Sequence, residues 1–286
     1  MKQFFMFPEA KSYDWSSNQQ FVYISKVNRE DINHPRTLHS HDDLVELILI
    51  TEGEGKIFIG DQYFDIKKGS LVIYNSHIVH DELFSSEPIA LYCIGIRGVK
   101  EKELRENALI SDTIEPIFET KQYYDLLLPL FQTAFEILEK EVSNYTEIVQ
   151  QLGRAIIALI KKNIINDTVK NVEESSKLQI VKEIKEYMDS YFSEDFKLNT
   201  FNKNGRWPIN EFYFAHKFKE LYDYSPIEYL QRRRIGEAQT LLINTDLSIT
   251  TIAYQVGFNS SSYFTTLFKK VVNLSPRVYR NQYTER

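Results

Sequence analysis

The sequence has almost no cysteine and no apolar run long enough to cross a membrane. Cys93 is the only cysteine among 286 residues, which excludes a disulfide scaffold and a zinc cluster built on cysteines. Without a membrane-spanning run, no membrane partner is expected. Residues 1–9 are short, carry one Lys and lack a small-residue cleavage site. We therefore interpret them as part of the mature chain and expect a cytoplasmic protein.

The composition is that of a folded protein. Hydrophobic residues make up 43% and charged residues 26%, which excludes a disordered or collagen-like chain. The length favours two domains of ordinary size over a single large one. The net charge of −6 is unevenly spread: residues 1–174 carry 18 Lys and Arg against 28 Asp and Glu, whereas residues 175–286 carry 16 against 12. A polyanionic partner is therefore expected to bind the second half.

Residues 1–110 have the pattern of short antiparallel strands. Six segments are rich in β-branched and aromatic residues and are separated by Gly and Asp. Gly60-Asp61 is typical of a hairpin turn between two of them. Several short strands without a long helical pattern indicate an antiparallel sandwich or barrel. The expected strands are 21–27, 45–51, 56–59, 63–66, 71–74 and 91–96.

The apolar period changes to that of helices within residues 111–165. Apolar residues recur at helical spacing over 124–138 and again over 148–160. Pro129 is expected to kink or restart the first helix. These helices could pack on the strands, form a dimer interface, or do both. Residues 166–176 are polar and aperiodic and form the expected linker to an all-helical domain, 177–286.

The helical domain contains an internal repeat with a spacing of 50 residues. Agreement at this many positions with one fixed offset is improbable by chance. Ser before Pro suits a helix N-cap followed by the first helical position. The matching pairs are Tyr213-Phe214 and Tyr263-Phe264, Phe218-Lys219 and Phe268-Lys269, Ser225-Pro226 and Ser275-Pro276, and Tyr229 and Tyr279.

The second copy extends upstream into a helix-turn-helix. An apolar helical stripe over 249–256 is followed by Gly257, which suits the left-handed position that ends a helix. Residues 259–262 supply an N-cap, and a new helix begins at Tyr263. Two helices joined by a Gly-containing turn form the DNA-binding motif whose second helix lies in the major groove.

These residues resemble the signature of the AraC/XylS family of bacterial transcription regulators. The resemblance covers residues 177–286 and implies two helix-turn-helix units, about 197–220 and 248–270, joined by a long helix over 227–243. They would read adjacent major grooves of double-stranded DNA. The matching residues are Ile252-Ala253, Val256-Gly257-Phe258, Tyr263-Phe264, Phe268-Lys269-Lys270, Ser275-Pro276 and Tyr279-Arg280.

The segments together predict an α+β protein of two domains. The resemblance to AraC/XylS regulators implies that residues 1–110 form a cupin-like antiparallel β-barrel that senses the effector. The helical hairpin expected at 111–165 would pack on this barrel or dimerise. After the linker, the all-α domain at 177–286 carries the two helix-turn-helix units on their long helix.

The exposed starts of the second helices in the two units are the expected DNA contacts. In the second unit short hydroxyls can bond to bases or phosphates, and the lysines are expected to meet phosphates. In the first unit Phe212 and Ala215 can make only apolar contacts, and His216 is the one polar reader. The family often has Arg where Thr266 stands, so a strong guanine contact would be missing. The predicted DNA-binding residues are Phe212, Ala215, His216, Lys219, Ser261, Ser262, Thr265, Thr266, Lys269 and Lys270.

Three further features of this domain follow from the residues. The first unit departs from the family upstream, where Asn204-Gly205 and Pro208 disfavour a full helix, although Asn210 can still cap the next one. Arg232-Arg233-Arg234 could contact phosphate or form a solvated, salt-bridged face. The aromatic residues at the repeated positions are expected in the core, because they share one stripe; they are Tyr213, Phe214, Phe218, Tyr263, Phe264 and Phe268.

A group of histidines in the first domain resembles the two cupin motifs, in His39-Ser40-His41, Glu46, Gly53, Gly69 and His80. His39 and His41 point the same way on a strand, and Glu46 joins them only if the chain bends before it. Three imidazoles and a carboxylate suit Fe, Mn, Ni or Zn. The resemblance to AraC/XylS regulators implies instead a small organic effector and no cofactor or metal. That effector would contact His39, His41, Glu46, Tyr74 and His80.

Three functions remain open from the sequence. The first is a transcription regulator, not an enzyme, which binds DNA as a homodimer, responds to a small-molecule effector and contacts RNA polymerase if it activates transcription. The second is a cupin-type metal-dependent enzyme or metal sensor that uses His39, His41, Glu46 and His80. The third is a regulator whose barrel only dimerises or binds a protein partner.

Overall fold

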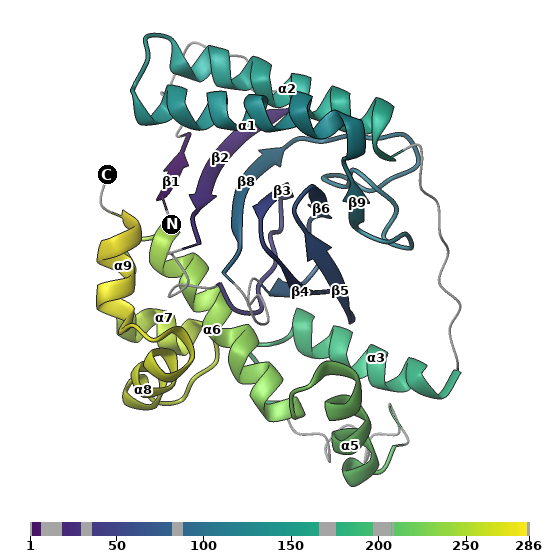
Figure 1. Cartoon of the computed structure of the whole chain (residues 1–286). Coiled ribbons are helices and arrows are strands. Elements are labelled where there is room, and N and C mark those ends of the chain that lie inside the picture. Colours follow the sequence, from purple (N-terminus) through teal and green to yellow (C-terminus); the bar gives the residue numbers. More distant parts are fainter. Residues whose placement is uncertain are drawn as a thin grey trace.

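The computed structural model describes residues 2–6, 19–29, 36–81, 88–165, 176–196, 207 and 209–284. An N-terminal domain of antiparallel sheets and two covering helices precedes a C-terminal domain of helices (Figure 1). The predicted α+β fold with two domains is confirmed. The expected linker, 166–176, lies outside the described residues except for Ser176, which begins the next helix.

The strands of the described residues form two antiparallel sheets. The larger has the order β1-β2-β8-β3-β6-β9 and the smaller β5-β4-β7. All six predicted strands are present, and the two-residue turn Gly60-Asp61 joins β4 to β5 with φ +63° at Gly60. The sequence pattern missed the short strands β1, β7 and β9. The bounds are β1 Lys2–Phe5, β2 Gln20–Val27, β3 Leu44–Glu52, β4 Glu54–Ile59, β5 Gln62–Lys67, β6 Ser70–Tyr74, β7 His80–Asp81, β8 Ala90–Arg97 and β9 Ile117–Glu119.

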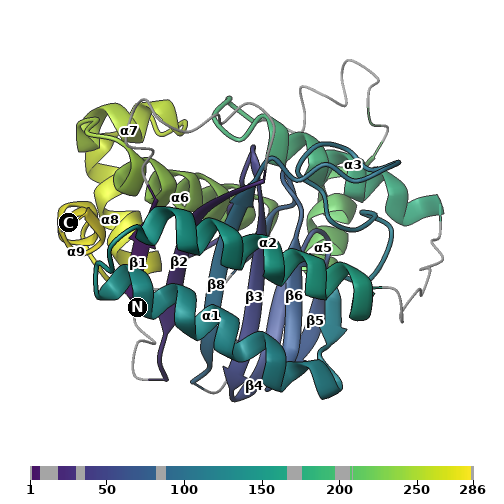
Figure 2. The same ribbon diagram turned by 90° about the horizontal axis from the view of Figure 1, so that it is seen from above.

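The larger sheet is buried on both faces, which agrees with the uninterrupted burial of residues 44–50 of β3. One face packs on the smaller sheet, so that Ile48 of β3 shares a core with Ile57 of β4. The other face is covered by α1 (Tyr124–Glu139) and α2 (Tyr145–Asn163), which lie side by side across the strands (Figure 2). The larger sheet therefore lies between the two covering helices and the smaller sheet.

The two helices after the strands pack on the sheet, which confirms the first of the roles considered for them. Phe131 of α1 and Ile156 of α2 are fully buried against it. A Cβ added to Gly153 of α2 would lie 2.9 Å from the ring of Phe21, which shows how closely the helix approaches. Helix α1 follows the short 3₁₀ turn η1 (Lys121–Tyr123) and continues through Pro129. Of the two effects expected of Pro129, the restart is wrong and the kink stays a prediction. The dimer interface stays a prediction.

The C-terminal domain is built around α6 (Pro226–Asn244), which agrees with the predicted helix 227–243. One core joins its first half to α3 and α5, and a second joins its second half to α7, α8 and α9. No helix in the described part of the chain combines the length and apolarity needed to cross a bilayer. The other bounds are α3 Ser176–Ser190, α5 Glu211–Tyr222, α7 Ile249–Gln255, α8 Ser261–Val272 and α9 Pro276–Thr284.

The sequence repeat is also a repeat of structure. Asn210 caps α5 and Ser260 caps α8, each by accepting from backbone N–H groups of the first turn. Both helices end on a left-handed residue, Asp223 at φ +59° and Asn273 at φ +62°. Burial along α5 and α8 follows the same pattern from the second residue onward. The second helices of the two units therefore have equivalent caps, ends and buried faces. The helix expected before α5 lies outside the described residues.

Helix α6 lies directly against the sheet domain (Figure 1). The backbone N–H of Thr37 donates to the side-chain oxygen of Gln239 at 3.0 Å, and both residues are buried. A Cβ added to Gly236 would clash with the carbonyl oxygens of Thr37 and Leu38. Only glycine permits the helix to approach the backbone this closely.

We predict that Gly236→Ala destabilises the protein by about 1–3 kcal/mol, because the added methyl group must displace the 37–38 backbone. Helix propensity alone gives the opposite sign, a gain of about 1 kcal/mol. Urea unfolding measures the difference. A variant as stable as the wild type or more stable would contradict the close contact between the domains.

Candidate nucleic-acid interface and sensor site

Helix α8 presents a polar face to solvent. Its exposed residues recur three and four apart and so lie on one side of the helix. Ser261 is half-buried, with its hydroxyl 3.4 Å from that of Thr250 on α7. The structure thus gathers the predicted contacts of the second unit on one surface. The exposed members are Ser262, Thr265, Thr266, Lys269 and Lys270.

The hydroxyl groups of the two threonines on this face already donate hydrogen bonds to backbone carbonyls. Thr265 donates to the Ser261 carbonyl at 2.9 Å, and Thr266 donates to the Ser262 carbonyl at 3.1 Å. Each oxygen keeps its lone pairs, and each side chain keeps an outward methyl group. In this conformation the threonines can accept from a base amino group or touch a thymine methyl group.

Helix α5 presents the equivalent face, with a different chemistry. Phe212 is 87% exposed, and Ala215, His216 and Lys219 are exposed beside it. His216 lies 3.7 Å from the carboxylate of Glu220. Phe212 therefore stands at the N-terminal end of this face, which begins at the start of α5.

The expectation that the six repeated aromatic residues lie in the core is confirmed for four of them and wrong for two. The four phenylalanines are fully buried, as predicted, whereas Tyr213 and Tyr263 are 41% and 51% exposed. Tyr263 accepts a hydrogen bond from the amide of Gln231 at 2.8 Å. The tyrosines lie one position before the buried stripe, so their rings reach its edge and their hydroxyls reach solvent. The buried residues are Phe214, Phe218, Phe264 and Phe268.

The three consecutive arginines of α6 have separate surroundings. Arg233 is buried and reaches Glu237 at 3.1 Å and Ser40 of the sheet domain at 3.1 Å. Arg234 donates to backbone carbonyls after α3, and Arg232 stacks on the ring of Tyr224. The burial of Arg233 rules out a phosphate contact for that side chain in this conformation.

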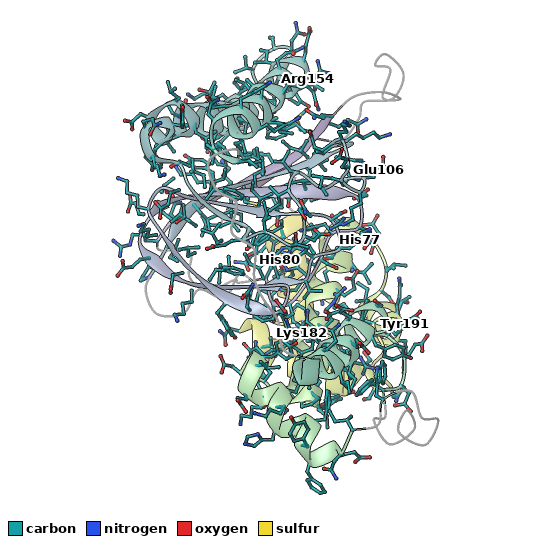
Figure 3. All side chains as sticks on the ribbon, turned by 90° about the vertical axis from the view of Figure 1, so that its right-hand side faces the viewer. His77, His80, Glu106, Arg154, Lys182 and Tyr191 are labelled. Carbon is teal, nitrogen blue, oxygen red and sulfur yellow. The ribbon has the colours of Figure 1, made fainter. Side chains whose placement is uncertain are left out.

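The histidine group converges as predicted. Residues 42–43 bend the chain, so that Glu46 on β3 meets His39 and His41 from the preceding segment. His80 on β7 joins them through paired backbone hydrogen bonds with His39, of 3.0 and 2.9 Å. Figure 3 shows His80 in the interior of the molecule, on the side of the sheet domain that faces Lys182 of α3. We call His39, His41, Glu46 and His80 the histidine cluster.

Backbone carbonyls fix the tautomers of two rings in the histidine cluster. Nδ1 of His39 donates to the Thr37 carbonyl at 3.0 Å, and Nδ1 of His80 donates to the Ile78 carbonyl at 2.9 Å. In a neutral ring the other nitrogen, Nε2, then carries a lone pair. Burial lowers the pKa of both His39 and His80, which favours the neutral form.

Glu46 is held as a carboxylate in this buried place. Burial acts to raise the pKa of Glu46, but the neighbouring imidazoles of His41 and His80 outweigh it and hold the pKa well below its ordinary value. Tyr23 donates its hydroxyl proton to Oε1 of Glu46, and burial together with this carboxylate raises the pKa of Tyr23. Oε2 is thereby left facing the imidazoles, 3.2 Å from Nε2 of His80 and 3.5 Å from Nε2 of His41.

A row of residues across the larger sheet builds this arrangement. Tyr23, Gly95, Glu46 and Tyr74 are neighbours in register on β2, β8, β3 and β6. A Cβ on Gly95 would overlap the Tyr23 ring, so the glycine lets the tyrosine lie across β8 and reach Glu46. On the other side Tyr74 stacks on His80, with ring centroids 3.8 Å apart. Sequence reasoning found Tyr74 and missed Tyr23 and Gly95.

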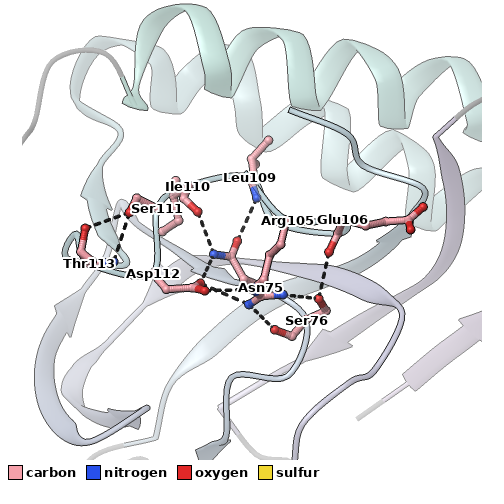
Figure 4. A network of polar contacts seen from close by, with 9 residues as sticks. All are labelled: Asn75, Ser76, Arg105, Glu106, Leu109, Ile110, Ser111, Asp112 and Thr113. Atoms are coloured by element: carbon pink, nitrogen blue, oxygen red, sulfur yellow. Dashed lines mark hydrogen bonds and ion pairs between the residues drawn. The ribbon is translucent and has the colours of Figure 1, made fainter. Parts of the chain in front are cut away.

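A polar network holds the loop between Tyr74 and His80 (Figure 4). Asn75 accepts from Leu109 N at 2.8 Å and donates to Asp112 at 2.6 Å. Arg105 donates to the Ser76 hydroxyl at 2.5 Å and pairs with Asp112 at 2.8 Å. These contacts give Ser76 a structural role in fixing the approach to His80.

A separate cavity of about 190 Å³ lies between β9, η1 and the end of α2. Ile117, Thr120, Tyr123 and Asn163 are among its lining residues. It shares no lining residue with the histidine cluster. This cavity was not predicted from the sequence.

Two family models match consecutive parts of the chain. Residues 21–157 match the AraC-like ligand binding domain, and residues 206–282 match a helix-turn-helix domain. The chain belongs to the AraC family of transcription regulators.

Relatives of this AraC-family regulator share most of its length. YdiP of Escherichia coli (strain K12), an uncharacterized HTH-type transcriptional regulator, is 24% identical over 86% of this chain and 81% of YdiP. YdeC of Bacillus subtilis (strain 168), described in the same words, is 24% identical over 90% of each chain. Fatty-acid-bound ToxT of Vibrio cholerae strain SCE256 covers 96% of this chain and 99% of its own at 16% identity and a TM-score of 0.49. Both YdiP and YdeC are described as transcriptional regulators, in agreement with the two domains of this AraC-family chain.

We predict that Tyr23→Phe destabilises this AraC-family regulator by about 1–3 kcal/mol, because an oxygen of the buried Glu46 carboxylate loses its donor. Tyr63→Phe, on the edge strand β5 and 36% exposed, serves as the control. Urea unfolding of both variants measures the effect. A loss for Tyr23→Phe no larger than for the control would show that the hydroxyl does not hold Glu46.

Proposed function

We propose that this regulator binds a specific double-stranded DNA site through α5 and α8 and that an effector held in the sheet domain controls this binding. The observation that carries the proposal is the structural repeat. Two helices with equivalent caps, equivalent ends and the same buried stripe expose different side chains to solvent. Two helices with the same framework and different exposed side chains suit a DNA site made of two unlike half-sites.

The long helix supports simultaneous reading of both halves. Helix α6 has 19 residues, which corresponds to about 28 Å of helix. Successive major grooves on one side of DNA lie about 34 Å apart. Because α5 packs near the start of α6 and α8 near its end, one rigid helix can place both readers on one side of the duplex.

Control of DNA binding by the sheet domain is supported by its direct contact with two helices of the C-terminal domain, α3 and α6. Asp61 at the β4–β5 turn pairs with Lys182 of α3 at 2.6 Å, and Arg36 donates to Thr240 of α6 at 2.7 Å. An effector that binds two arrangements of this contact unequally would shift the population between them.

Exposed apolar residues on the covering helices support a homodimer as part of the proposal. Leu126 of α1 is 58% exposed, and Ile148 of α2 is 38% exposed. RNA polymerase is a further partner if the regulator activates transcription. A DNA partner is compatible with the cytoplasmic location expected from the sequence.

We predict that Lys269→Ala and Lys270→Ala each make the slope of log affinity against log salt shallower by about one unit, because each lysine neutralises one phosphate. Lys140→Ala, at an exposed lysine directly after α1, is the control and leaves the slope unchanged. Fluorescence anisotropy over a salt series measures the slopes. Equal slopes in all four proteins would reject the phosphate contacts.

We predict that the double variant Thr265→Ala, Thr266→Ala loses about 10- to 100-fold in affinity for its selected site, while binding to unrelated DNA changes less than twofold. The reason is that base contacts specify a sequence and phosphate contacts do not. Competition between the two DNAs measures the ratio, with Thr113→Ala as a control in the sheet domain. Equal losses on both DNAs would remove the threonines from base reading.

A further inference from the structure

The histidine cluster holds four buried lone-pair donors that face one another. Nε2 of His39, His41 and His80 and Oε2 of Glu46 have no hydrogen bond of normal geometry within the described residues. All four residues offer a donor atom within 4.8 Å of the others. Leaving such an atom buried and unpaired destabilises the folded protein. Four of them at one point indicate a missing electron-pair acceptor.

The hydrogen bonds around the cluster orient these lone pairs inward. The Nδ1 protons of His39 and His80 are bound to backbone carbonyls, and Oε1 of Glu46 is bound to Tyr23. Outer contacts of this kind, a carbonyl behind each imidazole and a donor behind the carboxylate, are typical of metal ligands in proteins. Without a cation, Nε2 of His80 and Oε2 of Glu46 place two lone pairs 3.2 Å apart.

The spacing suits an ion better than an organic molecule. At a metal–ligand distance of about 2.1 Å, neighbouring ligand atoms are about 3.0–3.4 Å apart and opposite ones about 4.2 Å. The measured separations of 3.2 and 3.5 Å from Glu46 fall in or next to this range. Three imidazoles with one carboxylate favour Zn, Fe, Ni or Mn, and the predominance of nitrogen disfavours Ca and Mg.

The same segment that supplies two ligands also contacts the DNA-binding domain. His39 and His41 face the cluster, while Leu38 is buried among residues of α3, α5 and α6. Ser40 accepts from Arg233 of α6 at 3.1 Å. A shift of His39 and His41 toward a bound ion therefore moves residues that touch α6.

We propose that the histidine cluster binds one divalent first-row transition-metal ion and that this ion acts as effector through the contact of segment 36–41 with α6. The second part rests on the proposed function, control of DNA binding by the sheet domain. The first part stands on the geometry of the cluster alone.

Metal binding is tested on full-length, chelator-treated protein with Zn(II) and, for its visible absorption, Co(II). We expect one ion per chain after gel filtration and Co(II) bands of nitrogen and oxygen coordination. His39→Gln and His80→Gln should each lower occupancy at least tenfold. His77→Gln, at an exposed histidine near the cluster, should retain full occupancy.

Absence of Co(II) bands in the wild type would overturn the metal site, as would equal occupancy in the wild type and both cluster variants. Because the buried variants could fail to fold, His41→Gln is a third variant at a side chain that is 11% exposed. The wild-type spectrum decides the question even if every variant is unstable.

The effector role is tested with a DNA fragment selected by the protein, with and without Zn(II). We expect the affinity to change at least about fivefold. In Ser40→Ala, Gln239→Ala the metal should still bind, while the change in DNA affinity falls below twofold. Bound metal with unchanged DNA affinity in the wild type would overturn the effector role. Failure to bind any DNA in either state would overturn the proposed function, and metal occupancy would still decide the site.

Discussion

The contact between α6 and the 36–40 segment is the constraint on which the rest of the structure depends. Gly236 lets the helix approach the backbone carbonyls of Thr37 and Leu38, which no other residue would permit at this distance. The same helix carries both recognition units, and the same segment enters the histidine cluster one residue later. The sheet domain and the DNA-binding domain are therefore in contact through this short stretch of backbone, in addition to the contact between the β4–β5 turn and α3.

Much of the helical domain follows from the sequence because its signals are local. A helix cap, a left-handed helix end and an apolar stripe each depend on residues within a few positions of one another. The 50-residue repeat contains each of these signals in both of its copies. The strands could be located in the same way from their composition and turns. The misjudged tyrosines, Tyr213 and Tyr263, differ from the buried phenylalanines by one helical position, which periodicity alone does not resolve.

The cluster could be predicted only in part, because its geometry depends on register between distant strands. The sequence identifies the three histidines and Glu46, but the tyrosine that orients Glu46 comes from β2. The Tyr23 ring can cross β8 to reach Glu46 only because β8 has Gly95 between them. Arg233 could not be assigned either, since its partner Ser40 lies 193 residues away. Cross-strand and interdomain neighbours leave no periodic trace in a single sequence.

The most direct measurement is selection of sheared genomic DNA from the source organism by the full-length protein, once with chelator and once with Zn(II). The account predicts that at least one arm enriches a few fragments containing two short, unlike motifs about 10 base pairs apart, centre to centre. Retained fragments without a shared motif in both arms would contradict it, because two structurally equivalent recognition helices on one rigid helix would then read no sequence.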